Sequence, residues 1–205
     1  MSISRIVLGI GVLVLGIAAL ALAHDIRSWQ GGVDRGDTRF AAQPVAARWH
    51  AGTWLLGDPA LALLSLRDDL SVRRGEKAFA VALATPTGYD DGRQKSQARG
   101  LAELALSDPL ATGSPAQASR AGNLLGILAA TGESGSDAGV SDRRAAETFE
   151  SAIRADPANA NAKYNLELIL RRIKVVGSRE GAGGSSGYYG QSLTGAGAGL
   201  PGSGY

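Results

Sequence analysis

Two glycine-rich motifs near the carboxyl end of the chain match the patterns of catalytic and nucleotide-binding sites. Residues 183–187 (GGSSG) match G-x-S-x-G, in which a serine on a strand-to-helix turn attacks a carbonyl carbon with the help of a histidine. No histidine follows His50, so this serine has no later base. Residues 197–202 (GAGLPG) match G-x-G-x-x-G, but too few residues follow to build the helix that receives a pyrophosphate. We expect neither chemistry.

The remaining candidates for acid–base or metal chemistry are two histidines and a pair of aspartates. His24 and His50 have no carboxylates at a spacing typical of a metal site. Asp90 and Asp91 lack the alternating ligands and final glutamate of a calcium loop. The chain has no cysteine, which excludes thiol catalysis and cysteine-bound metals. The sequence therefore predicts a protein that is not an enzyme and has no cofactor or metal.

The most regular spacing in the chain belongs to a structural pattern within residues 143–173. Ala145, Phe149, Ala152 and Pro157 fall at the spacing of the second helix of a tetratricopeptide (TPR) repeat. The small alanine lets a neighbouring helix approach, the phenylalanine fills the space one turn later, and the proline ends the helix. Upstream, Leu125-Gly126 resembles the Leu-Gly step of a TPR first helix. We expect a TPR-like unit over residues 115–174, with a flexible loop at 131–141 between its helices.

A further helix is expected to open at residues 159–162, with Asn159 or Asn161 as its cap, and to end near residue 176. Apolar residues recur along it at helical intervals, and Tyr164 and Leu166 complete the structural TPR-like set. Its apolar stripe is either covered by the helix at 115–130 or forms a docking surface. The candidate residues for binding a partner are Tyr164, Leu168, Arg171 and Arg172, although the two arginines also suit the negative end of a helix dipole.

The amino-terminal part of the chain is directed to a membrane. Residues 1–5 form a short cationic head, and residues 6–23 are an unbroken apolar run long enough to cross a bilayer. This run is either a retained signal anchor, which we favour, or a signal peptide cleaved after Ala23. Residues 24–57 are expected to form a juxtamembrane segment with turns at Gly31-Gly32 and Gly36-Asp37. Trp29 could lie at the bilayer interface or pack on the folded domain.

The rest of the chain predicts an all-α fold. Short helices separated by turn residues are expected from residue 58 to 176, with Asp58 as an N-cap, a break at 67–71 and a helix stop at 107–109. Residues 177–205 are rich in glycine and serine and predict a disordered tail. The net charge of +2 and the lack of a dense basic run make nucleic acid an unexpected partner.

Several pieces of the chain resemble one family. The run DPANANAKYNLELILRR, and the earlier pieces GDTRF, TWLLGDPA, DDLSVRR and SRAGNLLGIL, are similar to TPR-containing membrane proteins found beside MoxR-type AAA+ ATPases and von Willebrand factor A (VWA) domain proteins, notably in actinobacteria. The resemblance implies a single-pass plasma-membrane adaptor with its domain on the extracytoplasmic side. It also implies a VWA-domain membrane protein as partner, in a complex that matures other proteins or inserts metals. The alternative is a secreted or cell-envelope structural protein released by cleavage after Ala23.

Overall fold

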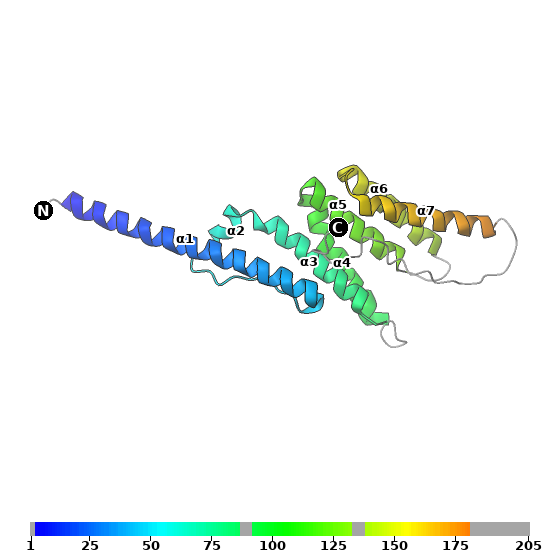
Figure 1. Cartoon of the computed structure of the whole chain (residues 1–205), viewed down its shortest axis with the longest axis horizontal. Helices are drawn as coiled ribbons and strands as arrows, with labels where there is room; N and C mark the ends of the chain where they lie inside the picture. Colours follow the sequence, from blue (N-terminus) through cyan, green and yellow to red (C-terminus); the bar gives the residue numbers. More distant parts are fainter. Residues whose placement is uncertain (1–2, 87–91, 133–137, 181–205) are drawn as a thin grey trace. The chain divides into compact units, whose positions relative to one another are not determined.

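A computed structural model describes residues 3–86, 92–132 and 138–180, with side chains described for 7–86, 92–132 and 138–175 (Figure 1). The fold is all-helical over these residues, as the sequence predicts. The chain divides into two compact units, Met1–Leu70 and Ser71–Tyr205. The first unit therefore includes the short helix after residue 58, which the sequence places in the following domain.

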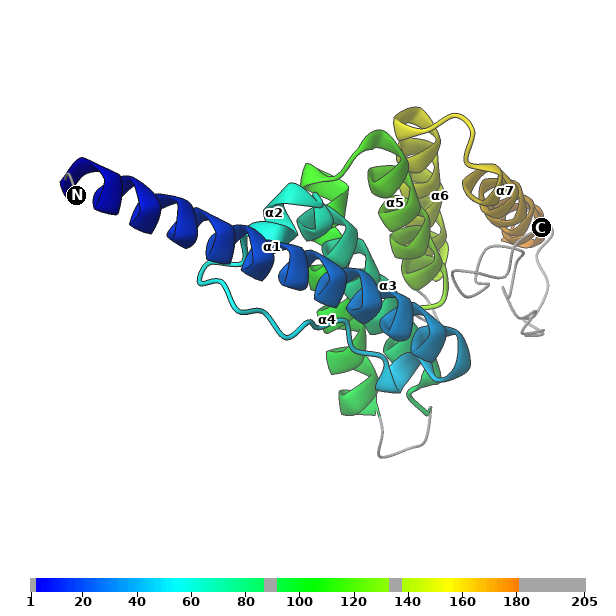
Figure 2. The same ribbon diagram turned by 60° about the vertical axis from the view of Figure 1, so that its left-hand side comes forward.

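The first unit is built on one long helix. Helix α1 runs from Ile3 to Ala42 without a break, and its apolar residues 7–20 are exposed. From Ala21 onward, one face is covered by the segment that follows the helix and returns alongside it (Figure 2). The covered positions recur every three or four residues, as one face of a helix requires: Ala21, Asp25, Trp29, Gly32, Gly36 and Phe40.

The predicted turns at Gly31-Gly32 and Gly36-Asp37 are wrong, because these residues lie within α1. A Cβ atom at Gly32 would lie 2.3 Å from the carbonyl oxygen of His50, and one at Gly36 would lie 2.2 Å from Cδ1 of Trp49. The glycines therefore make room for the returning backbone and for an indole ring. Close approach, and not a turn, explains their presence here.

The returning segment contains a short 3-10 helix, η1 (Pro44–Ala46), then an extended stretch and helix α2 (Pro59–Leu63). The predicted N-cap role of Asp58 is wrong: its side chain makes no capping bond, and its backbone is left-handed with φ of 52°. Its carboxylate oxygens instead accept hydrogen bonds from Nε1 of Trp29 at 2.8 and 2.9 Å. This bond fastens α2 to α1, and it places Trp29 in the apolar cluster with Ala60 and Leu70.

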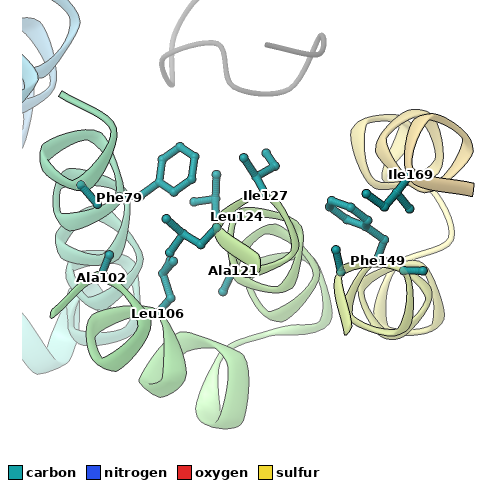
Figure 3. Packing of buried hydrophobic residues seen from close by; sticks show 12 residues of the cluster. Phe79, Ala102, Leu106, Ala121, Leu124, Ile127, Phe149 and Ile169 are labelled. Atoms are coloured by element: carbon teal, nitrogen blue, oxygen red, sulfur yellow. The ribbon is translucent and has the colours of Figure 1, made fainter. Parts of the chain in front are cut away.

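The second unit is a series of antiparallel helices in which each helix packs on the next. It contains most of α3 (Leu66–Ala84), then α4 (Gly92–Thr112), α5 (Pro115–Ala130), α6 (Ala138–Ala155) and α7 (Ala160–Glu180). Their inward faces share one apolar core, to which Phe79 of α3, Leu106 of α4, Ile127 of α5 and Phe149 of α6 contribute (Figure 3).

Two predicted breaks in these helices are wrong. Helix α3 passes through residues 67–71, and Leu70 is buried there. Helix α4 continues through Pro109 to Thr112. Pro109 is itself buried, so apolar packing offsets the loss of one backbone hydrogen bond.

Helix α5 has the predicted bounds because its start is specified locally. Ser114 accepts a hydrogen bond from the backbone amide of Gln117, the Gln117 side chain accepts one from the Ser114 amide, and Pro115 occupies the first turn. The following loop is shorter than predicted, since α6 already begins at Ala138. Likewise α7 extends to Glu180, past the predicted start of the tail at 177. Residues 87–91, 133–137 and 181–205, with both glycine-rich motifs, Asp90 and Asp91, lie outside the described residues.

Candidate interaction surface

The residues of the predicted TPR-like pattern meet between α5 and α6. Phe149 is only 2% exposed, and its ring lies directly over Gly126: a Cβ atom there would be 2.4 Å from Cε1 of the ring. One turn along, a Cβ atom at Gly122 would be 3.2 Å from Cβ of Ala152. Ala145 is fully buried, and Leu125 packs against the same core. The two helices approach closely because small residues of one face larger residues of the other.

The turn between α6 and α7 is held by side-chain bonds to the backbone. Asp156 accepts a hydrogen bond from the Ala158 amide at 2.9 Å, and Pro157 prevents continuation of α6. Oδ1 of Asn159 accepts from the Ala162 amide at 3.0 Å, which confirms one of the two predicted caps. Nδ2 of Asn159 also donates to Oγ of Ser119 in α5 at 2.8 Å. One residue thus fixes both the start of α7 and its position against α5.

A buried pair of amides ties α7 to α5. Nδ2 of Asn165 donates to Oδ1 of Asn123 at 2.9 Å, and both residues are buried. Buried amides without a partner are costly, so this bond specifies the register between the two helices. Neither asparagine is among the residues predicted to form a site. The signal available in the sequence was that each precedes a leucine, as Asn123-Leu124 and Asn165-Leu166.

Arg172 differs from the other three candidate binding residues because its side chain is bonded within the fold. Its guanidinium donates through Nε to Oδ2 of Asp142 at 2.7 Å, pairs through Nη2 with Oδ1 of the same carboxylate, and donates to the carbonyl oxygen of Ala130 at 3.0 Å. Burial lowers the pKa of Arg172 below its usual range. Asp142 is itself buried. The structure therefore gives Arg172 the role of joining α7 to the start of α6 and the end of α5, in place of an exposed contact.

Tyr164, Leu168 and Arg171 remain together on the outside of α7. They are spaced four and three residues apart and so share one helix face, which we call the α7 outer stripe. The Tyr164 residue is 45% exposed, Leu168 is half-buried, and Arg171 is exposed and paired with Glu167 through a 2.5 Å contact from Nη2 to Oε1. Ile169 and Leu166 of α7 face the core instead. The stripe offers an aromatic ring, an aliphatic side chain and a cation in a row.

A second exposed feature is an open groove of about 620 Å³ among α4, α5 and α6. Three cations and one carboxylate line it, namely Lys95, Arg99, Arg144 and Glu103. Arg99 is already engaged, since its Nη2 donates to the carbonyl oxygen of Leu128. The sequence did not predict this groove, because its lining comes from helices far apart in the chain.

Among the residues with described side chains, no group of three or more His, Asp or Glu is close enough to hold a metal ion. Within the same part of the chain, one helix, α1, is long and apolar enough to cross a membrane. Comparisons with known proteins found no matching family model, no matching curated protein and no matching solved structure.

Proposed function

We propose that this protein is a non-enzymatic, membrane-anchored helical adaptor, whose second unit binds a protein partner through the α7 outer stripe. The amino-terminal part of α1 supports the anchor. Leu8, Leu15 and Leu20 are all exposed there, as are the apolar residues between them. Fourteen consecutive exposed residues in a helix that is apolar on every side suit a lipid environment far better than water.

The observation that carries the adaptor proposal is the close contact between Gly126 and Phe149. These residues occupy the glycine of the TPR first helix and the phenylalanine of the TPR second helix in the pattern read from the sequence. Ala145 and Ala152, at the other two pattern positions of α6, are buried beside them. We therefore interpret α5, α6 and α7 as a TPR-like unit followed by the first helix of another. Stacked helices of this kind bind protein segments on extended surfaces.

Retention of the anchor is favoured over release by signal peptidase. The residues before the possible cleavage point, Ala21-Leu22-Ala23, lie inside α1. Ala21 is only 8% exposed, and Leu22 packs against the apolar cluster of the first unit. Cleavage would need this covered helical turn to open. We propose a single-pass plasma-membrane protein with its second unit on the extracytoplasmic side, the side favoured by the short cationic head.

The partner we propose is a VWA-domain membrane protein, within a MoxR-type assembly that assists maturation or metal insertion. This part of the proposal is based on the sequence resemblance alone. The chemistry of the α7 outer stripe suits such a role, because tyrosine, leucine and arginine side chains can provide both apolar contact and charge at an interface.

The test is affinity capture with the full chain in detergent. The double variant Tyr164→Ala/Leu168→Ala removes the apolar part of the stripe, and Leu104→Ala, at a leucine of α4 that is 71% exposed, is the control. We expect the double variant to lose the VWA-domain partner and the control to retain it, with both as stable as the parent chain. Undiminished capture by the double variant would contradict the α7 site, and capture that never includes a VWA-domain protein would contradict the named partner.

A further inference from the structure

The first unit exposes a tryptophan and a leucine at the turn that precedes α2. Trp54 is 69% exposed and Leu56 is 100% exposed. Between them, Leu55 is half-buried. The Trp54 ring stacks on the His24 ring of α1, with centroids 4.0 Å apart. Exposing an aromatic ring and a leucine two residues apart to water is unfavourable. The position of these two side chains along α1 indicates what could cover them.

Asp25 fixes the position of this turn along the axis of α1. Its Oδ1 accepts a hydrogen bond from the Trp54 amide at 2.7 Å, and its Oδ2 accepts one from the Leu55 amide at 3.0 Å. Asp25 itself is fully buried under the turn. It is also the first acidic residue after the apolar run, which ends at Ala23. The backbone of residues 54 and 55 is therefore held beside the end of that run.

The length of the apolar run places Asp25 and the turn that it holds at the membrane boundary. Eighteen helical residues, 6–23, span about 27 Å at 1.5 Å per residue, against a hydrocarbon core of about 30 Å. The run has no excess length, so its last turn must lie where hydrocarbon meets headgroups. The turn containing Trp54 and Leu56 is held beside that last turn by Asp25 and by the stacking of Trp54 on His24.

We propose that Trp54 and Leu56 form a second membrane contact, inserted into the interfacial layer of the same bilayer that α1 crosses. This inference depends on the membrane anchoring proposed above and goes beyond it. Tryptophan favours the interface, because its ring is apolar while its N–H can bond to water or headgroups. Asp25 is a positioning residue for this contact. The α1 helix crosses the bilayer, and the turn at Trp54 and Leu56 contacts the bilayer to one side of it. Together these two contacts fix the rotation of α1 about its own axis, whereas a spanning helix alone leaves that rotation free.

The experiment uses the absence of cysteine from the chain. Single variants Leu15→Cys, Leu56→Cys and Val45→Cys of the full chain are labelled with an environment-sensitive fluorophore and reconstituted into phosphatidylcholine vesicles containing lipids with nitroxide-labelled acyl chains. Leu15 reports the anchor and Leu56 the proposed contact. Val45 is the control, since it is exposed and lies just past the far end of α1, about 25 Å along the helix from Asp25.

We expect quenching at Leu15 and Leu56, and none at Val45. Quenching at Leu15 without quenching at Leu56 overturns the second contact and leaves the anchor intact. No quenching at Leu15 overturns the anchor, and the inference with it. Equal quenching at Leu56 and Val45 also overturns the inference, since it shows contact that is not specific to the turn.

A second measurement tests Asp25. Asp25→Asn retains the size of the side chain but replaces one carboxylate oxygen with a donor, so one of the two amides loses its acceptor. Losing a hydrogen bond to a charged acceptor should lower the ratio of docked to undocked turn by about tenfold. This ratio is measured from the quenched and unquenched lifetime populations at Leu56, and quenching at Leu15 should stay the same. An unchanged ratio would overturn the positioning role of Asp25.

Discussion

Replacing Gly126 by alanine tests the packing between α5 and α6 on which the adaptor proposal depends. In an open helix, alanine is about 1 kcal/mol more favourable than glycine. At Gly126 the new Cβ atom would lie 2.4, 2.6 and 2.9 Å from three atoms of the Phe149 ring. Phe149 is 2% exposed, and protein cores are close-packed, so the two helices must separate or the ring must leave its rotamer.

The magnitude follows from these two opposing effects. Overpacking a core costs about 1–3 kcal/mol, and contacts this short against a rigid ring belong at the upper end. After subtraction of the helix-propensity gain, we expect Gly126→Ala to destabilise the second unit by about 2 kcal/mol. Gly100→Ala in α4 is the matched control, because a Cβ atom there would have nothing within 4 Å. This control should be stabilised by about 1 kcal/mol.

The assay separates the two units of the chain. All three tryptophans lie in Met1–Leu70, so their fluorescence during denaturation follows the first unit and should be the same for both variants. Hydrogen exchange of the backbone amides of α5 and α6 follows the second unit. The thermal midpoint of that unit should fall on the order of 10 °C for Gly126→Ala.

A second substitution tests whether the Phe149 ring causes the loss of stability. Phe149→Leu removes the ring and is itself destabilising. In the Phe149→Leu background, however, Gly126→Ala should destabilise the second unit much less than in the parent chain, because the effects of substitutions at contacting residues are not additive. Equal stabilities of Gly126→Ala and Gly100→Ala would refute the close contact. An unchanged cost of Gly126→Ala beside Phe149→Leu would refute the ring as its cause.

Four other outcomes are expected. Asn165→Ala leaves the buried side-chain oxygen of Asn123 without its donor and should cost about 1–3 kcal/mol by hydrogen exchange in α5, whereas no change would mean that water replaces the bond. Asp142→Ala leaves the Arg172 guanidinium without its carboxylate and should cost about 2 kcal/mol, below the value for a fully buried pair because Arg172 is about one-third exposed; adding Arg172→Met should recover part of it. The pKa of Arg172 is lower in the folded chain than in the unfolded chain, so between these two pKa values the unfolded chain binds more protons. The stability of the parent chain should therefore rise with pH in that alkaline window only, and urea titrations at several pH values would measure the rise. Mass spectrometry of the chain purified from membranes should find residues 1–23 retained, and a chain beginning at His24 would contradict the anchor.

The sequence predicted most accurately where the structure depends on neighbouring residues. The bounds of α5 follow from Ser114, Pro115 and Gln117, which act within a single turn. The end of α6 follows from Pro157, and the start of α7 from Asn159. Such signals are readable because the partners lie within four residues of each other.

Predictions failed where a residue is used by a distant part of the chain. The glycines at 32 and 36 were read as turn residues, but they admit a segment that returns from beyond Ala42. Asp58 was read as a cap, but its partner is Trp29, 29 positions earlier. Arg172 was read as a surface cation, but its partner is Asp142, 30 positions earlier.

The all-helical fold, the apolar run and the small-residue pattern between α5 and α6 were determined by the sequence alone, because composition and the period of 3.6 residues are local properties of a chain. Only the tertiary structure decided which polar side chains are used internally and which face outward. Asp25, Asn165 and Arg172 all satisfy partners about 30 to 40 residues away, and no spacing rule connects them. Trp54 and Leu56 on the first unit and the α7 outer stripe on the second are among the groups that face outward, and they are the proposed contacts.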